Sequence, residues 1–203
     1  MGLAPSFASV DKIIKPILFV LCLIPLFFIV FIAVQHVNPI EYFLDQTGLW
    51  ALRFLLITLC ITPLRKLSKW YEMIRFRRML GLYSFFYAVL HVSTYIIFDQ
   101  SLDISSIIKD IEERPFIMVG FFAFILLIPL AITSTNAMMR RLGGKRWQAL
   151  HRLVYLIGIA GVLHFWWLAQ SKVKLGEPFI YAICLALLLL VRYPPIMARL
   201  AKL

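Results

Sequence analysis

The sequence predicts an all-α polytopic membrane protein, in which residues 1–203 form a single domain built as a bundle of six transmembrane helices. Hydrophobic residues make up 62% of the chain, whereas soluble globular domains are about 45–50% apolar. Apolar runs close to the roughly 20 residues that a membrane-spanning helix needs recur along the whole length. The segments between these runs alternate between basic and acidic. These observations argue against a soluble enzyme, and also against a nucleic-acid-binding protein in spite of a net charge of +11.

Each predicted span rests on one apolar run. The first run is followed by the polar residues 36–39, and no small-residue cleavage pattern follows it, so we interpret it as a retained helix and not as a signal peptide. The second, third and fifth runs carry Arg53, His91 and His164 inside otherwise apolar sequence, and the fourth contains no charged residue. The sixth is the shortest, with a charge-free core at 178–191. The six predicted spans are 17–37, 46–63, 79–98, 116–137, 151–170 and 178–193.

Lysine and arginine gather in alternate connecting segments, and this pattern predicts the orientation. Basic loops remain on the cytoplasmic side of a bacterial inner membrane. We therefore expect both termini to be cytoplasmic and the third and fifth helices to run outward in parallel. The basic residues are Arg65, Lys66, Lys69, Arg75, Arg77, Arg78, Arg140, Arg141, Lys145 and Arg146, and the acidic residues of the other loops are Glu41, Asp45, Asp99, Asp103, Asp110, Glu112, Glu113 and Glu177.

The acidic segment 101–115 contains a further, shorter helix. Its isoleucines follow the i, i+3, i+4, i+7 spacing of an amphipathic helix, and Asp103 is placed to cap the amino-terminal end. We expect this helix to lie flat on the outer membrane surface. Alternatively, this helix covers or docks an external partner. The isoleucines are Ile104, Ile107, Ile108 and Ile111.

Two histidines in the third and fifth spans give the strongest indication of function. An imidazole in hydrocarbon is costly unless it is paired or bound, so an intramembrane histidine marks a candidate functional site. His91 lies thirteen residues beyond Arg78, and His164 lies thirteen residues beyond His151, which is an axial rise of roughly 20 Å in each helix. Parallel helices therefore place His91 and His164 at one depth in the outer half of the membrane. Because imidazole is the usual axial ligand of haem iron, the pair predicts a cytochrome b-type bundle that carries electrons.

Other residues near these levels leave alternatives open. Thirteen residues rotate an ideal helix by about 140° from the starting face, so His151 shares a face with His164 only if the helix bends. Gly158 and Gly161 either permit such a bend or close approach of a haem, or are ordinary small packing residues of membrane helices. Arg53 either extends toward the outer surface or pairs with a haem propionate.

Six short stretches between residues 45 and 170 together resemble one known family. They are TGLWAL at 47–52, TPLR at 62–65, RMLGLY at 78–83, PLAITS at 129–134, RLG at 141–143 and WQALHRLVY at 147–155. In these stretches, and in His91 and His164, the chain resembles the MsrQ (YedZ) family of the ferric-reductase and NADPH-oxidase transmembrane superfamily.

The resemblance implies a function and a set of cofactors. The family is the haem-binding membrane subunit of a periplasmic methionine sulfoxide reductase system, which implies b-type haem and electron transfer from the quinone pool to a molybdopterin-containing catalytic subunit that repairs oxidised methionine. Flavin mononucleotide (FMN) is also attributed to the family. His91, His151 and His164 fall on the family's haem-histidine positions, whereas Arg78 stands near the fourth position, where the oxidases have histidine. The resemblance thus leaves two roles open for His151, as a ligand of a second haem or as a neighbour of the flavin.

The basic residues at the inner level carry a further hypothesis. Arg77 and Arg78, with Arg140, Arg141 or Lys145, are expected to hold a flavin phosphate or guide the electron donor. The alternative is that they follow the charge rule and contact anionic membrane lipid. We expect no sulfoxide chemistry on this chain, because it has no cysteine cluster, and no nucleotide fingerprint G-x-G-x-x-G is present. The competing functions are a stand-alone ferric or oxygen reductase and a haem-free membrane anchor.

Overall fold

The computed structural model describes residues 10–171 and 176–192, and every regular element in these ranges is helical. The elements, with η marking 3-10 or π turns, are η1 (Val10–Ile14), α2 (Lys15–Ala33), α3 (Pro39–Ser68), η2 (Tyr71–Arg75), α4 (Arg77–Thr94), η3 (Tyr95–Asp99), α5 (Ile104–Glu113), α6 (Pro115–Ile132), α7 (Asn136–Leu142), α8 (Gly144–His151), α9 (Leu153–Ser171) and α10 (Gly176–Val191). Helices α2, α3, α4, α6, α9 and α10 correspond in order to the predicted spans, so the all-α polytopic fold is confirmed.

The sixth predicted span is the shortest helix of this set. Among the described residues, five helical segments are long and apolar enough to cross a membrane. Helix α10 has 16 residues, or about 24 Å, and it packs against α9 and α3. Residue 193, the predicted end of this span, lies outside the described residues.

The fourth predicted span extends beyond its helix, and the fifth contains a turn. The predicted helix 116–137 ends at Ile132, because the Thr133 and Ser134 hydroxyls donate to carbonyls of the preceding turn and Thr135 caps a new helix by accepting from the Met138 amide at 3.1 Å. The predicted span 151–170 falls within one candidate span, Gly144–Gln170, in which a turn at Arg152 divides α8 from α9 and leaves His151 on α8. Local bonds of hydroxyl side chains compete with helix continuation, and hydropathy does not detect them.

The second span is longer than predicted at both ends. Helix α3 begins at Pro39 and ends at Ser68, whereas the apolar run covers only 46–63. The Asn38 side chain accepts a hydrogen bond from the Glu41 amide at 3.2 Å, and proline in the first turn needs no amide partner. Lys69 ends the helix in the left-handed conformation, with φ of 57°.

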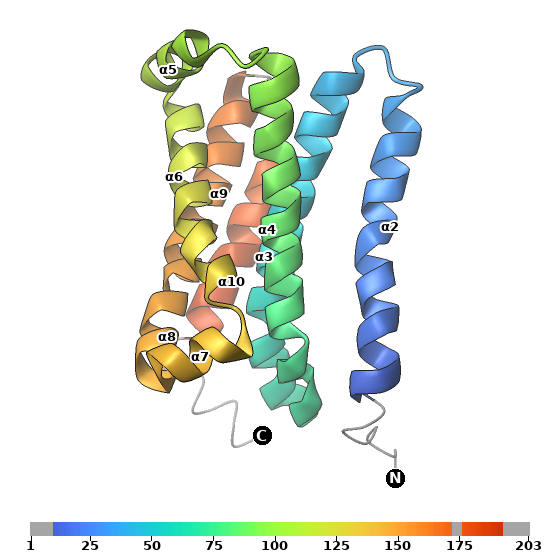
Figure 1. Ribbon diagram of the computed structural model, residues 1–203, viewed down its shortest axis with the longest axis vertical. Helices are drawn as coiled ribbons and strands as arrows, with labels where there is room; N and C mark the ends of the chain where they lie inside the picture. The colour runs from blue at the N-terminus through green and yellow to red at the C-terminus, as the bar shows by residue number, and fades with distance from the viewer. Residues whose placement is uncertain (1–9, 172–175, 193–203) are drawn as a thin grey trace.

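Successive spans run in opposite directions, as Figure 1 shows. Helices α2, α4 and α9 run one way, and α3, α6 and α10 run the other way. The connection from α3 to α4 therefore lies beside α7 and α8 at one end of the bundle, which we call the basic end. The connection from α2 to α3, helix α5 and the start of α10 lie at the opposite, acidic end. The predicted parallel arrangement of the third and fifth spans, α4 and α9, is confirmed.

Helix α5 lies across the acidic end, and its predicted cap is present. Asp103 accepts a hydrogen bond from the Ser105 amide at 2.9 Å. The Asp110 carboxylate accepts from the Tyr95 hydroxyl and from the Gln100 amide nitrogen, each at 3.1 Å. Two isoleucines of the apolar stripe, Ile104 and Ile108, are exposed. Asp110 thus fastens α5 to the bundle, and the open apolar edge suits a membrane surface or a partner.

Helix α2 is fastened to the rest of the bundle by a buried tyrosine. Tyr87 of α4 is fully buried, and its hydroxyl donates to the Cys22 carbonyl at 2.9 Å and accepts from the Leu26 amide at 3.1 Å. The hydroxyl therefore stands between two backbone groups that are four residues apart in α2, at the turn containing Pro25. An inserted side chain of this kind locally replaces the helix's own hydrogen bond.

Candidate functional site

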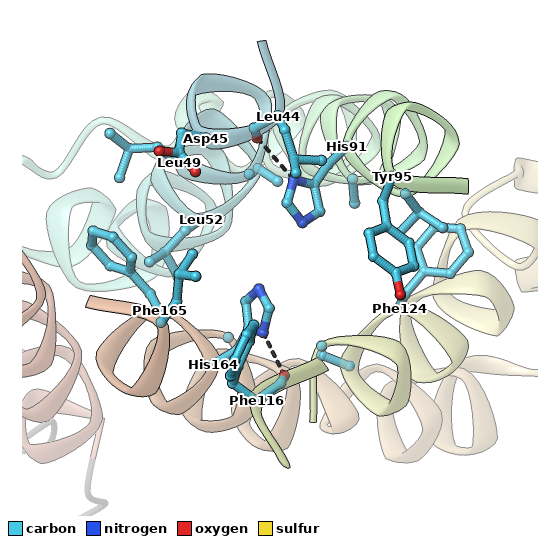
Figure 2. A pocket seen from close by; sticks show the side chains of 18 of the residues that line it. Leu44, Asp45, Leu49, Leu52, His91, Tyr95, Phe116, Phe124, His164 and Phe165 are labelled. Carbon is cyan, nitrogen blue, oxygen red and sulfur yellow. Dashed lines mark hydrogen bonds between the residues drawn. The ribbon is translucent and has the colours of Figure 1, made fainter. Parts of the chain in front are cut away.

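His91 of α4 and His164 of α9 face each other across a cavity inside the bundle, as Figure 2 shows. The centroids of the two imidazole rings are 6.1 Å apart, and the ring planes meet at 80°. The structure therefore brings together the two residues that the sequence places at a common depth.

A backbone carbonyl of a neighbouring helix orients each imidazole. The Nδ1 atom of His91 lies 2.9 Å from the Leu44 carbonyl oxygen of α3, and Nδ1 of His164 lies 2.6 Å from the Phe116 carbonyl oxygen of α6. A carbonyl oxygen only accepts, so Nδ1 carries the proton and Nε2 keeps its lone pair. Both rings point into the cavity (Figure 2). The site therefore offers two neutral nitrogen ligands that face one another.

Two glycines give the imidazoles room against the neighbouring helices. A Cβ atom on Gly48 of α3 would lie 2.8 Å from Nδ1 of His91, and a Cβ atom on Gly120 of α6 would lie 2.8 Å from Nδ1 of His164. Separations below 3.0 Å require a shift of one of the two groups. Each ring thus occupies the space that a side chain would fill, and the carbonyl that accepts its hydrogen bond lies one helical turn away.

The two half-sites repeat one arrangement. In the pair α3 and α4, the elements are the Leu44 carbonyl, Gly48 and His91; in the pair α6 and α9, they are the Phe116 carbonyl, Gly120 and His164. Residues four apart lie above one another on a helix face, so each pair presents a carbonyl and a gap to the ring of its partner helix. The histidines are consequently held in the same way from opposite walls of the cavity.

The cavity between the half-sites has a volume of about 860 Å³, within the roughly 300–1,000 Å³ of ligand and cofactor pockets. Figure 2 shows Leu52 and Phe165 on one side of the space between the histidines and Tyr95 and Phe124 on the other. Polar residues line the cavity where it reaches the acidic end. They are Asn38, Glu41, Asp45, Gln46, Asp99, Arg114 and Glu177.

This donor set fits a haem. Metal–imidazole bonds are about 2 Å long, so two imidazoles on opposite sides of one ion have ring centroids about 6 Å apart, close to the observed 6.1 Å. No group of three or more metal-ligating side chains is found among the described residues. Two axial nitrogens inside a wide, apolar cavity therefore suit an iron whose other ligands belong to a macrocycle.

The third histidine, which the sequence places at the inner level, lies at the other end of the bundle. His151 ends α8 at the basic end, where its ring stacks on Trp147 with centroids 3.8 Å apart. Its Nδ1 is 3.0 Å from the Trp147 carbonyl oxygen, and its Nε2 is 3.4 Å from the Ser134 hydroxyl. Arg152 separates it from the helix that carries His164. A role for His151 in ligating a second haem therefore stays a prediction.

The two arginines predicted to act together point to different places. Arg78 donates to the Asn136 side chain and lines a separate cavity of about 340 Å³ with Lys15 and Arg75. Arg77 instead lies within electrostatic range of Tyr155 and His151, on α9 and α8. The structure thus splits the predicted phosphate-binding pair between two sides of α4.

The structure places three other residues whose roles the sequence left open. Arg53 donates through Nε to the Tyr181 hydroxyl at 2.8 Å, which links α3 to α10, and its guanidinium lies 4.8 Å from the Trp50 ring centroid. Gly158 packs on α10, where a Cβ atom would lie 3.2 Å from Leu185. Gly161 lines the large cavity.

Sequence reasoning missed Gly48, Gly120 and the two backbone carbonyls. A glycine inside an apolar helix is destabilising relative to alanine by about 1 kcal/mol, so each glycine was a signal for close packing. The backbone carbonyls of Leu44 and Phe116 could not be identified from the sequence, because every residue type has one. Only the packing of one helix on another determines which carbonyl meets a ring.

Comparison with known proteins agrees with this geometry. The family model described as ferric reductase like transmembrane component matches residues 47–162, which include His91 and His151 and end just before His164. No solved structure matches the chain.

Three relatives are each named protein-methionine-sulfoxide reductase heme-binding subunit MsrQ. The protein of Herminiimonas arsenicoxydans is 52% identical over 183 residues, covering 89% of this chain and 84% of the relative. That of Ralstonia nicotianae is 55% identical, covering 75% and 70%. That of Bordetella pertussis is 46% identical, covering 93% of both. The chain therefore belongs to the ferric reductase like transmembrane component family and, within it, to the MsrQ proteins.

Proposed function

We propose that the chain is a membrane haem b electron-transfer subunit, which passes electrons from the quinone pool across the bacterial inner membrane to a periplasmic, molybdopterin-containing methionine sulfoxide reductase. The observation that carries the proposal is the pair of facing imidazoles, His91 and His164, with centroids 6.1 Å apart inside an apolar cavity. The names of the relatives support it, since each is called a heme-binding subunit of a protein-methionine-sulfoxide reductase.

The residues of the chain bind and orient the haem. His91 and His164 would both hold the haem iron through Nε2, and this would leave no ligand position for oxygen. The carbonyls of Leu44 and Phe116 hold the rings in orientation and raise the basicity of Nε2, as outer-shell hydrogen-bond acceptors do. The apolar walls exclude water from the site. When bound, the haem supplies reversible one-electron transfer.

The acidic end is the proposed exit for electrons. The cavity reaches this end, and Arg114 is the one lysine or arginine among the described residues that line it. Arg114 also forms an ion pair with Asp110, at 3.3 Å. We assign to Arg114 the contact with a haem propionate, because a guanidinium suits a carboxylate. The periplasmic catalytic subunit would then approach the haem from this end.

The basic end is the proposed entry for electrons. FMN or a quinol would bind there, near the level of Arg77, Arg78 and His151. Because the structure separates Arg77 from Arg78, a flavin phosphate has two candidate positions, one inside the bundle and one facing α7. Counting iron and flavin per chain in His151→Ala distinguishes a second haem ligand, which lowers iron, from a flavin contact, which lowers flavin only.

The test of the haem site is a set of matched histidine variants. Purified wild-type protein is expected to show a low-spin spectrum with sharp reduced α and β bands. His91→Ala and His164→Ala should each abolish or convert that spectrum and stop electron delivery to the partner. His36→Ala is the control, because His36 is exposed at the acidic end, where its Nδ1 accepts from the Asn38 amide at 3.3 Å.

The outcomes separate the competing functions. An unchanged low-spin spectrum and haem content in either variant would show that the ligand assignment is wrong. Wild-type protein without haem would leave the membrane anchor as the function. Sustained oxygen or ferric reduction by the purified chain with a quinol, in the absence of any partner, would favour the stand-alone reductase.

A further inference from the structure

Three arginines from separate parts of the chain gather inside the basic end of the bundle. Arg65 belongs to the last turn of α3, Arg77 to the first turn of α4, and Arg192 directly follows α10. Arg77 lies within electrostatic range of both other guanidinium groups and of the Tyr155 hydroxyl on α9. We call Arg65, Arg77 and Arg192 the arginine triad.

Several hydrogen-bonding atoms of the triad and its surroundings are buried without a partner. The Nε atoms of Arg65 and Arg192 have no hydrogen-bond partner among the described residues, and neither does the hydroxyl of Thr62, three residues before Arg65. Arg192 uses its terminal nitrogens on the Tyr155 hydroxyl, at 3.0 Å, and on the Leu59 carbonyl. A buried donor without an acceptor is costly, so these groups are suited to an acceptor supplied by a ligand.

The chain offers the triad little negative charge. Eight of its ten acidic residues belong to the acidic end. Of the other two, Glu72 lies 3.8 Å from Arg75 on its own η2 turn, and Asp11 belongs to η1, which packs on α2. Residues 1–9, 172–175 and 193–203, which lie outside the described ranges, contain no aspartate or glutamate. Like charges close together away from water repel, so a bound anion would stabilise this arrangement.

We propose that the arginine triad is a binding site for a phosphate group. Guanidinium forks match phosphate oxygens in geometry and charge. The triad brings three guanidinium groups from three elements of the fold. Arg192 keeps its Nε for a ligand, and the Thr62 hydroxyl adds a neutral donor. A phosphate held there ties the ends of α3, α4 and α10 together at the level where electrons are expected to enter.

The phosphate has two sources with the same recognition chemistry. One is the phosphodiester of an anionic lipid, and the other is the phosphate monoester of FMN. Binding of a lipid phosphate would not depend on the electron-transfer role. Binding of FMN rests on the proposed function, and it would place the flavin phosphate inside the bundle at Arg77 and not on the α7 side at Arg78.

Thermal unfolding of purified protein tests the proposal. The protein is delipidated in a neutral detergent and titrated with FMN, with riboflavin, with short-chain phosphatidylglycerol and with the matching uncharged diacylglycerol. Arg65→Gln with Arg192→Gln removes two members of the triad. Arg146→Gln with Arg152→Gln is the control, because it removes the same charge from exposed positions of the basic end that have no proposed role in binding.

A phosphate site predicts that wild-type and control proteins are stabilised by FMN but not riboflavin, or by phosphatidylglycerol but not diacylglycerol. The triad variant should need an about tenfold higher concentration for the same stabilisation, or more. Which compound acts identifies the source of the phosphate. Equal responses of the triad variant and the control to both phosphate compounds would overturn the proposal.

Two further measurements keep the test decisive. The haem spectrum reports on the distant histidine pair, so a triad variant with an intact spectrum has lost only the basic-end site. If the double variant does not fold, Arg65→Lys and Arg192→Lys retain the charge and remove the fork, and the same tenfold weakening is expected. If the purified protein contains no haem, the proposed function fails, but the lipid titration can still be measured. Failure of the proposed function is therefore distinguished from failure of this inference.

Discussion

Adding one methyl group at Gly48 or Gly120 should displace a haem ligand without harming the fold. The Cβ atom of Gly48→Ala would lie 2.8 Å from Nδ1 and 2.9 Å from Cε1 of His91, and Gly120→Ala would place its Cβ atom at the same distances from His164. Ordinary contact begins at 3.4 Å. Each ring must therefore move by about 0.6 Å into the cavity.

The consequence for the haem follows from these distances. Moving His91 by that amount takes Nδ1 from 2.9 Å to beyond good hydrogen-bonding distance from the Leu44 carbonyl. The shift also exceeds the roughly 0.2 Å tolerance of metal–ligand distances. Loss of such an outer-shell partner lowers metal affinity about 10–100-fold, and we expect that loss of haem affinity in each variant.

Haem titration of the apoprotein, followed by absorbance, measures this effect. Gly81→Ala is the matched control, because its Cβ atom would lie 3.7 Å from the Thr58 methyl group, an ordinary contact. Helix propensity alone would stabilise each alanine variant by about 1 kcal/mol, so thermal unfolding of the apoproteins should not be weakened. Haem affinities of Gly48→Ala and Gly120→Ala equal to that of Gly81→Ala would refute the half-site geometry.

Three further predictions follow from single contacts. Tyr87→Phe should lower the free energy of unfolding by about 1–3 kcal/mol, because the hydroxyl between α2 backbone groups is lost; chemical denaturation measures this, and a change near zero would show that α2 re-forms its own hydrogen bond. Arg53→Gln and Tyr181→Phe should be non-additive in the same assay, since the two side chains share one hydrogen bond; strict additivity would contradict that link. A thiol-specific reagent should label Lys109→Cys from outside intact spheroplasts, because this side chain is 72% exposed at the acidic end; labelling only after the membrane is opened would reverse the predicted orientation.

The sequence alone determined the order and relative direction of the six apolar helices and the pairing of His91 with His164. Hydropathy identifies each apolar run, alternating loop charge makes α4 and α9 parallel, and a fixed helical rise then places the two histidines at one depth. These are local properties that need no knowledge of neighbours. The predicted ends of the spans were less accurate where Asn38 or Thr135 caps a helix.

The tertiary structure alone decided which faces of the helices meet. Gly48 and Gly120 are far from the histidines in sequence, and only the packing of α3 on α4 and of α6 on α9 brings each glycine and carbonyl to a ring. The same rotation of α4 turns Arg77 toward Arg65 and Arg192 and turns its neighbour Arg78 toward Asn136. Rotation about a helix axis is set by contacts between helices, since an all-round apolar span carries little information about its own orientation.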